Sequence, residues 1–146
     1  MGKQTLNPEG MQAPRGSYYT VAVADPGRIV AIAGQTASDA EGNVVGVGDI
    51  REQTRATLAK IRLAVEAVGG GIEDIVALTV YITDARYYSD VNETRREVFG
   101  PSFPTSTMVQ VVALARPELL IEINALAVVP ESSLKVDLLG ASRPSS

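Results

Sequence analysis

The chain has 146 residues, enough for one compact domain, and its 45% hydrophobic and 21% charged content supports a folded core and excludes disorder. It contains no Cys, His or Trp. Without Cys and His there are no disulfides, thiolate nucleophiles, serine–histidine triads or ordinary zinc sites. Any chemistry must therefore use carboxylates, Arg, Lys, Tyr, hydroxyls, amides or water, and a magnesium or calcium site with oxygen ligands stays formally open.

The charge balance points away from nucleic acid as a partner. Thirteen basic residues, of which ten are Arg and three are Lys, stand against 17 acidic residues, giving a net charge of −4. An acidic surface repels phosphate backbones. No apolar run is long enough to cross a membrane, and residues 1–10 lack the hydrophobic core of a signal peptide. We therefore expect a soluble, cytoplasmic protein with no membrane partner.

The N-terminal part predicts a hairpin. Residues 1–15 are polar and indicate an entry arm. Two β-prone segments follow at 17–24 and 28–34, joined by Asp25-Pro26-Gly27, in which Pro presets φ and Gly supplies a positive φ. Residues 35–48 are polar and Gly-rich, as expected of a loop.

A helix over 49–68 is the clearest element of the sequence. Asp49 and Glu52 form a capping-box pattern, in which each side chain satisfies a free backbone donor. Apolar residues then recur at helical spacing, and Gly69-Gly70-Gly71 ends the helix.

The remaining segments alternate between strands and a second helix. They are a strand at 75–83, a helix at 87–99, and strands at 106–114 and 119–129. The order β-β-α-β-α-β-β predicts an α+β fold in which a single sheet packs on two helices. This domain spans 1–130, and 131–146 form a polar C-terminal tail.

The sheet has more apolar surface than two helices can cover. Helices on one face leave the other face bare, yet residues of both faces are apolar, which predicts a homo-oligomer. The residues that need such partners are Val21, Val23, Ala31, Ala33, Val109 and Val111.

Polar residues interrupt two of these apolar patterns. Glu122 and Asn124 share one face of the last strand, where burial without partners is costly. A solvated or edge face is the more frequent arrangement, and a polar site at a subunit junction is the alternative. Asn92 is a poor helix former inside a helix, which favours a specific contact. Arg95-Arg96 indicates a solvated helix face rather than an anion clamp.

Three further short segments carry weaker signals. Tyr18 and Tyr19 open the first strand, where tyrosine usually packs. Gly34-Gln35 closes the second strand, and Gly there either admits a ligand or ends the strand. Thr105, Ser106 and Thr107 place three hydroxyls in a row, which fits either a turn or a binding rim.

Together these segments resemble the reactive intermediate deaminase family (RidA/YjgF, also filed under endoribonuclease L-PSP). The resemblance covers roughly residues 15–129 in family order. The matching pieces are Gly16-Ser17-Tyr18, Ala33-Gly34-Gln35, residues 49–54, residues 80–84, Val91-Asn92, Phe103-Pro104 and residues 121–123.

The resemblance implies a chorismate-mutase-like (YjgF-type) α+β fold and a homotrimer with clefts between subunits. It implies hydrolysis of enamine and imine intermediates to a 2-keto acid and ammonia, without a metal or organic cofactor. This chemistry suits the residues present, since an iminium is already electrophilic and needs only a held water and a carboxylate that moves protons.

Carried over by position, the resemblance implies that Glu122 orients the attacking water. It also implies that Tyr18, Gly34 and Asn92 line the cleft.

One element of the family pattern is missing. The family's Pro-x-Arg turn supplies an Arg for the substrate carboxylate, and here the turn is Pro104-Thr105-Ser106. A hydroxyl cannot replace a guanidinium as a cation. Arg15 or Arg116 could reach the cleft from elsewhere, which the sequence does not decide.

The leading hypothesis is a trimeric RidA-like hydrolase or deaminase acting on a small imine- or enamine-type metabolite. Because Ser106 replaces Arg, we expect weak or no activity on simple 2-imino acids. The alternative is a non-catalytic small-molecule-binding or regulatory trimer, in which Thr105, Ser106 and Thr107 bind a neutral or polar ligand. A ribonuclease or translation inhibitor ranks lowest, given the net charge of −4 and the lack of His.

Overall fold

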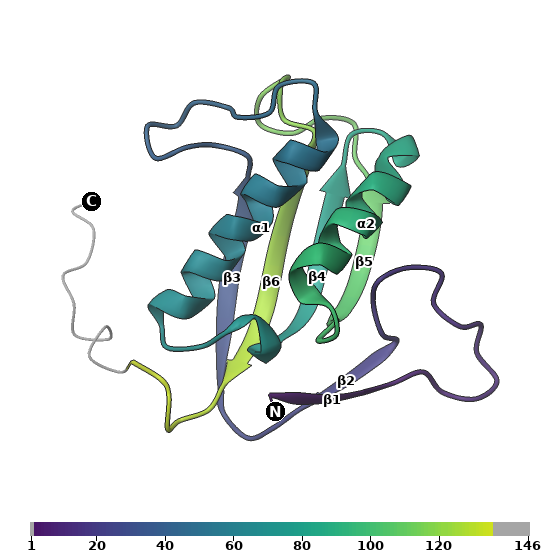
Figure 1. Cartoon of the computed structure of the whole chain (residues 1–146), viewed down its shortest axis with the longest axis vertical. Coiled ribbons are helices and arrows are strands. Elements are labelled where there is room, and N and C mark those ends of the chain that lie inside the picture. The colour runs from purple at the N-terminus through teal and green to yellow at the C-terminus, as the bar shows by residue number, and fades with distance from the viewer. Residues whose placement is uncertain (1, 136–146) are drawn as a thin grey trace.

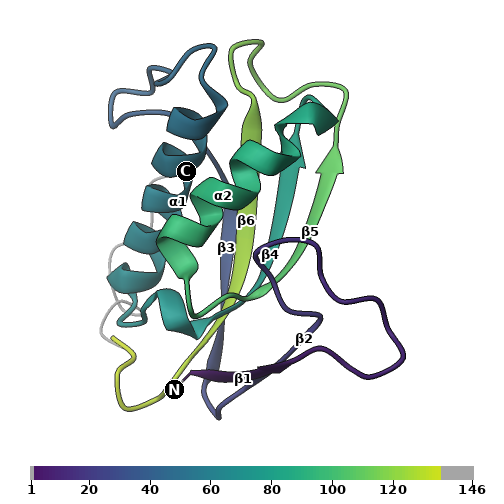
Figure 2. The same cartoon turned by 45° about the vertical axis from the view of Figure 1, so that its right-hand side comes forward.

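Two helices lie side by side across one face of a four-stranded sheet (Figures 1 and 2). The computed structural model describes residues 2–135. In chain order the elements are β1 (Lys3–Leu6), β2 (Val21–Ala24), β3 (Arg28–Thr36), α1 (Ile50–Ala67), η1 (Ile72–Asp74), β4 (Ile75–Ile82), η2 (Ala85–Tyr87), α2 (Tyr88–Phe99), β5 (Thr105–Gln110) and β6 (Ile121–Val129).

The strands of the main sheet run in the order β3-β6-β4-β5. β6 pairs antiparallel with both β3 and β4, whereas β4 and β5 are parallel and are connected through α2. The helices cover the face that carries the buried aliphatic residues of β4 and β6. The expected α+β fold with two helices on one sheet face is confirmed.

The predicted hairpin between the segments 17–24 and 28–34 is wrong. β2 pairs antiparallel with β1, which lies in the segment expected to be an arm, and β3 pairs with β6. Tyr19, which precedes β2, forms an isolated bridge with Thr105 of β5, and β2 itself contacts β4. Figure 2 shows the β1-β2 pair crossing the end of the sheet near β4 and β5.

Gly27 does not have the conformation that the hairpin prediction assumed. Its φ is not positive, and an added Cβ would lie 2.5 Å from the carbonyl oxygen of Val129. Glycine is required there because the end of β6 packs against the turn, and not for left-handed backbone. The turn therefore moves the chain from one sheet to the next.

α1 begins and ends where the sequence indicates, but only half of the expected capping box forms, because the backbone N–H of Asp49 donates to the carbonyl of Gly46 and not to the side chain of Glu52. The Asp49 carboxylate accepts a hydrogen bond of 3.0 Å from the backbone N–H of Glu52, and Gly69, with φ +91°, follows the last turn. The buried face of the helix packs on the sheet and includes Leu58, Ile61 and Val65.

Gln53 on α1 fixes the approach to β6. Its side chain is fully buried, donates 2.8 Å to the carbonyl of Glu118 and accepts 2.8 Å from the N–H of Leu120. A buried amide with both ends satisfied specifies one position for the chain that it holds. The start of β6, and with it Glu122, is therefore set by α1.

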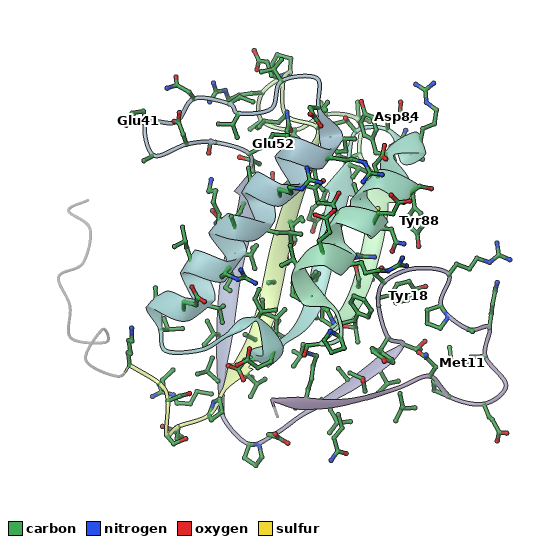
Figure 3. The ribbon with its side chains drawn as sticks, viewed as in Figure 1. Met11, Tyr18, Glu41, Glu52, Asp84 and Tyr88 are labelled. Carbon is green, nitrogen blue, oxygen red and sulfur yellow. The ribbon has the colours of Figure 1, made fainter. Side chains whose placement is uncertain are left out.

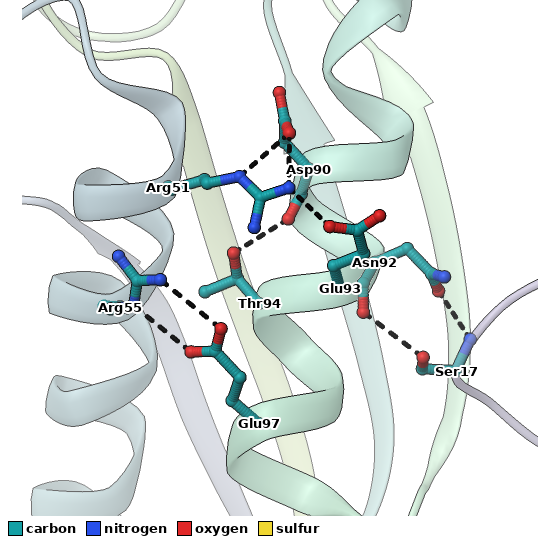
Figure 4. Close-up of polar contacts among 8 residues, drawn as sticks. All are labelled: Ser17, Arg51, Arg55, Asp90, Asn92, Glu93, Thr94 and Glu97. Atoms are coloured by element: carbon teal, nitrogen blue, oxygen red, sulfur yellow. Dashed lines mark hydrogen bonds and ion pairs between the residues drawn. The ribbon is translucent and has the colours of Figure 1, made fainter.

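Ion pairs join the exposed edges of the two helices (Figure 4). Arg51 binds Asp90 and Glu93, and Arg55 binds Glu97 at 3.2 Å. Such exposed pairs add little stability. They connect α1 to the outward face of α2, so the opposite face of α2 is directed toward the sheet.

The face of the sheet away from the helices is apolar and open. Ile29 is 74% exposed, Val109 is 42% exposed and Leu126 is 39% exposed. Of the residues expected to need partners, Ala31 and Ala33 of β3 and Val109 of β5 are exposed on this face. Val23 is exposed on β2, which belongs to the separate β1-β2 sheet, and Val21 and Val111 are half-buried. We call this face of the main sheet the open face.

The chain after β6 returns to α1. Leu134 packs against the core, and the backbone N–H of Lys135 donates 2.9 Å to the carbonyl of Val68. The rest of the expected tail, 136–146, lies outside the described residues. No helix among residues 2–135 is long and apolar enough to span a bilayer.

Candidate functional site

The first candidate cavity is on the open face, with a volume of about 610 Å³. We call it the open-face cavity. It lies over β3 and β6, and its lining includes Gly34, Tyr81, Leu114, Glu122 and Asn124. The expectation that Glu122 and Asn124 share one strand face is met, since Ile121, Ile123 and Ala125 between and beside them are buried on the other face.

Gly34 and Glu122 are in direct contact. A Cβ added to Gly34 would lie 2.1 Å from Oε2 of Glu122, so only glycine lets the carboxylate rest against the backbone of β3. The pairing of β3 with β6 shifts register between Ile32 and Gln35, which places Gly34 in an irregular part of the strand. β3 continues to Thr36, so Gly34 serves this close approach and does not end the strand.

The second candidate cavity is on the helix side of the sheet, with a volume of about 140 Å³. It is lined by Tyr18, Tyr88, Arg95, Ser106 and Met108, and we call it the arginine cavity. A neighbouring hollow of about 340 Å³ shares both tyrosines and adds Gln12, Ala13 and Arg15. Figure 3 shows Tyr88 at the start of α2 and Tyr18 on the loop that precedes β2.

Arg95 is buried, which corrects the expectation of a solvated helix face. Its side chain is only 1% exposed, whereas the adjacent Arg96 is exposed. Nη1 donates 2.5 Å to the hydroxyl of Ser106, Nη2 donates 3.3 Å to Oδ1 of Asn92, and Nε has no partner. The sequence held one signal for this, because Arg95 follows Val91 by four residues and so lies on the apolar side of the helix.

The Arg95 guanidinium has no carboxylate within 4.0 Å among the described residues. Burial lowers its pKa, and nearby Tyr88 and Tyr18 oppose that change. The ordinary arginine pKa lies so far above neutrality that the group stays charged. The arginine cavity therefore contains a buried, uncompensated positive charge.

Asn92 positions the loop that carries Tyr18 (Figure 4). Its Oδ1 accepts 2.5 Å from the N–H of Ser17, and its carbonyl accepts 3.2 Å from the hydroxyl of Ser17. A Cβ on Gly16 would lie 2.6 Å from the hydroxyl oxygen of Tyr88. The Gly16-Ser17-Tyr18 segment is thus docked tightly on α2.

The other expected site residues have different surroundings. The hydroxyl of Thr105 donates 2.9 Å to the carbonyl of Val76, so it ties β5 to β4. Thr107 is exposed. Nη1 of Arg116 donates 2.6 Å to the carbonyl of Gly42, which holds this side chain at the 37–49 loop, whereas Arg15 lies beside Tyr18.

Strand register separates the two cavities. Tyr81 is paired with Glu122 of β6 and with Val109 of β5. Ser106 is three residues before Val109, so alternation directs it to the opposite face from Glu122. One copy of the chain therefore brings Gly34 to Glu122, and brings Tyr18 and Arg95 to Ser106, but leaves the two groups on opposite faces of the sheet.

The described chain offers no evident metal site. Among residues 2–135, no group of three or more His, Cys, Asp or Glu side chains is placed to hold a metal ion.

Comparison with known proteins defines the class to which this fold and these residues belong. The profile of the family described as Endoribonuclease L-PSP matches residues 10–129. A RutC family protein of Pyrococcus horikoshii is 35% identical over 125 residues, covering 86% of this chain and 97% of that protein.

Solved structures agree with this match. The Rid family protein YyfB of Yersinia pestis, described as of unknown function, superposes with a TM-score of 0.80 at 30% identity, covering 88% of this chain and 100% of that one. The YjgF gene product of E. coli superposes with a TM-score of 0.64 at 31% identity, covering 86% and 98%. The chain belongs to the Endoribonuclease L-PSP family, whose members also carry the names Rid and YjgF.

The contact of Gly34 with Glu122 predicts energetic coupling between them. In a Glu122→Ala background, Gly34→Ala should stabilise the fold by about 0.4–1 kcal/mol, because Ala restricts the unfolded chain. In the wild type the same change must displace the carboxylate, so the gain should be lost or reversed. Denaturant unfolding of the four proteins measures this difference. Equal effects of Gly34→Ala in both backgrounds would show that the contact carries no energy.

Proposed function

We propose that the protein hydrolyses a small imine- or enamine-type metabolite and that Glu122 is its catalytic carboxylate. The observation that supports this most directly is the placement of Glu122. Its carboxylate rests on the backbone of Gly34 in an open cavity and forms no ion pair with any residue of 2–135. Such a carboxylate is free to accept a proton from water. Family membership supports the same class of reaction.

The proposed reaction needs only water and this carboxylate. An enamine first tautomerises to the imine, whose protonated form is attacked by water at the C=N carbon. Glu122 takes a proton from that water and returns it to nitrogen. The C–N bond then breaks and the nitrogen leaves as ammonia. The carbinol O–H becomes a carbonyl, and its proton passes to that ammonia to give ammonium. No electrons are exchanged with any other group, so no cofactor is required.

We place the complete site between copies of the chain in a homotrimer. Within one copy the sheet separates the arginine cavity from the open-face cavity. The two cavities can meet if a second copy brings its arginine cavity against the open-face cavity of the first. The exposed aliphatic residues of the open face, such as Ile29 and Leu126, give that association a driving force. The Ser-for-Arg replacement leads us to propose an altered substrate range relative to Arg-bearing members.

The binding-only alternative loses part of its support. It relied on a rim of three hydroxyls, yet Thr105 is bonded to the backbone of β4 and Ser106 to Arg95. Only Thr107 of the three remains exposed and without such a bond.

Glu122→Gln should abolish turnover without unfolding the protein. The amide keeps the shape of the side chain but cannot take a proton from water, so we expect a loss of about 10²-fold or more in kcat. The assay uses enzymatically generated 2-iminopropanoate and 2-aminoacrylate, and Glu118→Gln, an exposed change just before β6, is the control. Turnover that survives Glu122→Gln would exclude Glu122 as the catalytic group.

The same assay tests the altered substrate range. The wild type should hydrolyse 2-iminopropanoate more slowly than a family member that retains the Pro-x-Arg turn. Deamination at an equal rate would contradict the proposed shift.

Leu126→Glu should disrupt the trimer. A charge in the middle of the open face must be desolvated in any assembly that covers it. Sedimentation equilibrium should show a trimer for the wild type and smaller species for the variant. Leu63→Glu, at a 68% exposed position on α1, is the matched control and should leave the trimer intact. A wild type that is monomeric would contradict the proposal.

A further inference from the structure

The strongest unexplained feature outside the open-face cavity is the state of Arg95. A guanidinium has five N–H donors, and two of them are used here, by Ser106 and by Asn92. Nε is buried and has no partner. A charge removed from water without a counter-ion is strongly unfavourable, so such groups persist where something compensates them.

The charge of Arg95 lies beside Ser106 on the neighbouring strand. Arg95 comes from α2, but its guanidinium contacts the hydroxyl of Ser106 on β5. Ser106 is the residue that stands where the family resemblance leads us to expect an arginine. A cation is therefore present beside Ser106, but it comes from α2 instead of β5, and this different origin agrees with the altered substrate range proposed above.

The volumes of the arginine cavity and of the adjoining hollow limit the size of the ligand. The arginine cavity holds about 140 Å³, room for a small anionic group, and the adjoining hollow of about 340 Å³ gives space for the rest of a small molecule. Tyr18 and Tyr88 line both spaces and therefore lie where a molecule would pass from one to the other.

We propose that Arg95 is the specificity-determining residue of the site and that it binds the carboxylate of a small 2-imino or 2-oxo acid. This inference rests on the proposed function for the identity of the ligand class. The two carboxylate oxygens accept from guanidinium N–H groups that the protein leaves free. Ser106 and Asn92 hold the guanidinium in place and are positioning residues.

Calorimetric binding of pyruvate and of its neutral amide, pyruvamide, tests the proposal. Pyruvate is the 2-oxo acid that hydrolysis of 2-iminopropanoate would release. The wild type should bind pyruvate about tenfold or more tightly than pyruvamide, as expected for charged hydrogen bonds. Arg95→Met should lose this preference, and Arg96→Met, a change at the exposed neighbour, should keep it. Retention of the preference by Arg95→Met would overturn the proposal.

The stability of Arg95→Met separates binding from a structural role. Replacing a buried, unpaired charge by a similar apolar side chain is often neutral or stabilising. We therefore expect the Tm to be unchanged or higher while pyruvate no longer raises it. If Arg95→Met does not fold, Arg95→Lys retains the charge without the planar fork and should keep a weakened preference for pyruvate. Equal binding of pyruvate and pyruvamide by Arg95→Lys would count against the proposal.

Returning the cation to β5 gives a gain-of-function test. The double variant Arg95→Met/Ser106→Arg should recover the pyruvate preference that Arg95→Met loses. Failure of the wild type to bind pyruvate, together with a change in oligomeric state on Arg95→Met, would mean that an acidic group of a second copy is the counter-ion, which contradicts the proposal.

Two separate measurements distinguish this proposal from the proposed function. Pyruvate binding by the wild type and by Arg95→Met requires no turnover, so it is measured apart from hydrolysis. If hydrolysis proves absent but pyruvate binding depends on Arg95, only the proposed function fails.

Discussion

Every second side chain of β6 belongs to the core, and this alternation determines where the polar groups of the strand lie. Ile121, Ile123, Ala125, Ala127 and Val129 are buried beneath the helices. Glu122 and Asn124 must then project from the open face. A slip of one residue would bury the carboxylate and expose the isoleucines, so the same packing that stabilises the sheet also fixes the candidate catalytic group.

The same alternation on β5 determines which face of the sheet Ser106 occupies. Met108 packs against the core, so Ser106 on the same face meets α2 rather than the open-face cavity. The polar groups of the chain are divided between two faces of one sheet. The proposal that a second copy completes the site follows from this division, because no side-chain rotation carries Ser106 through the sheet to Glu122.

Local sequence patterns predicted where the helices and strands lie, but not which strands pair with one another. The α1 cap at Asp49 and the face shared by Glu122 and Asn124 depend on neighbours within a few residues, and both are as expected. The β1-β2 pair was missed because its register joins Lys3 to Ala24, and no local signal encodes which strand a segment will choose.

The burial of Arg95 likewise depends on tertiary contacts that local sequence patterns do not reveal. Composition favours a solvated arginine, and only its position on the apolar stripe of α2 argued otherwise. Its contact with Ser106 depends on how α2 packs on β5, which the sequence does not reveal. The Pro104-Thr105-Ser106 turn carries no arginine, but the sequence alone does not show that the buried Arg95 lies beside Ser106.

Mixing two inactive variants tests the shared site most directly. Glu122→Gln damages one face and Arg95→Met the other, so a copy of each can supply one intact pair of faces. Co-refolded mixtures should recover roughly a quarter of the wild-type sites by random assortment in a closed oligomer. Hydrolysis of 2-iminopropanoate restored to about that level is the predicted result. A mixture no more active than the separate variants would contradict a site that is completed between two copies.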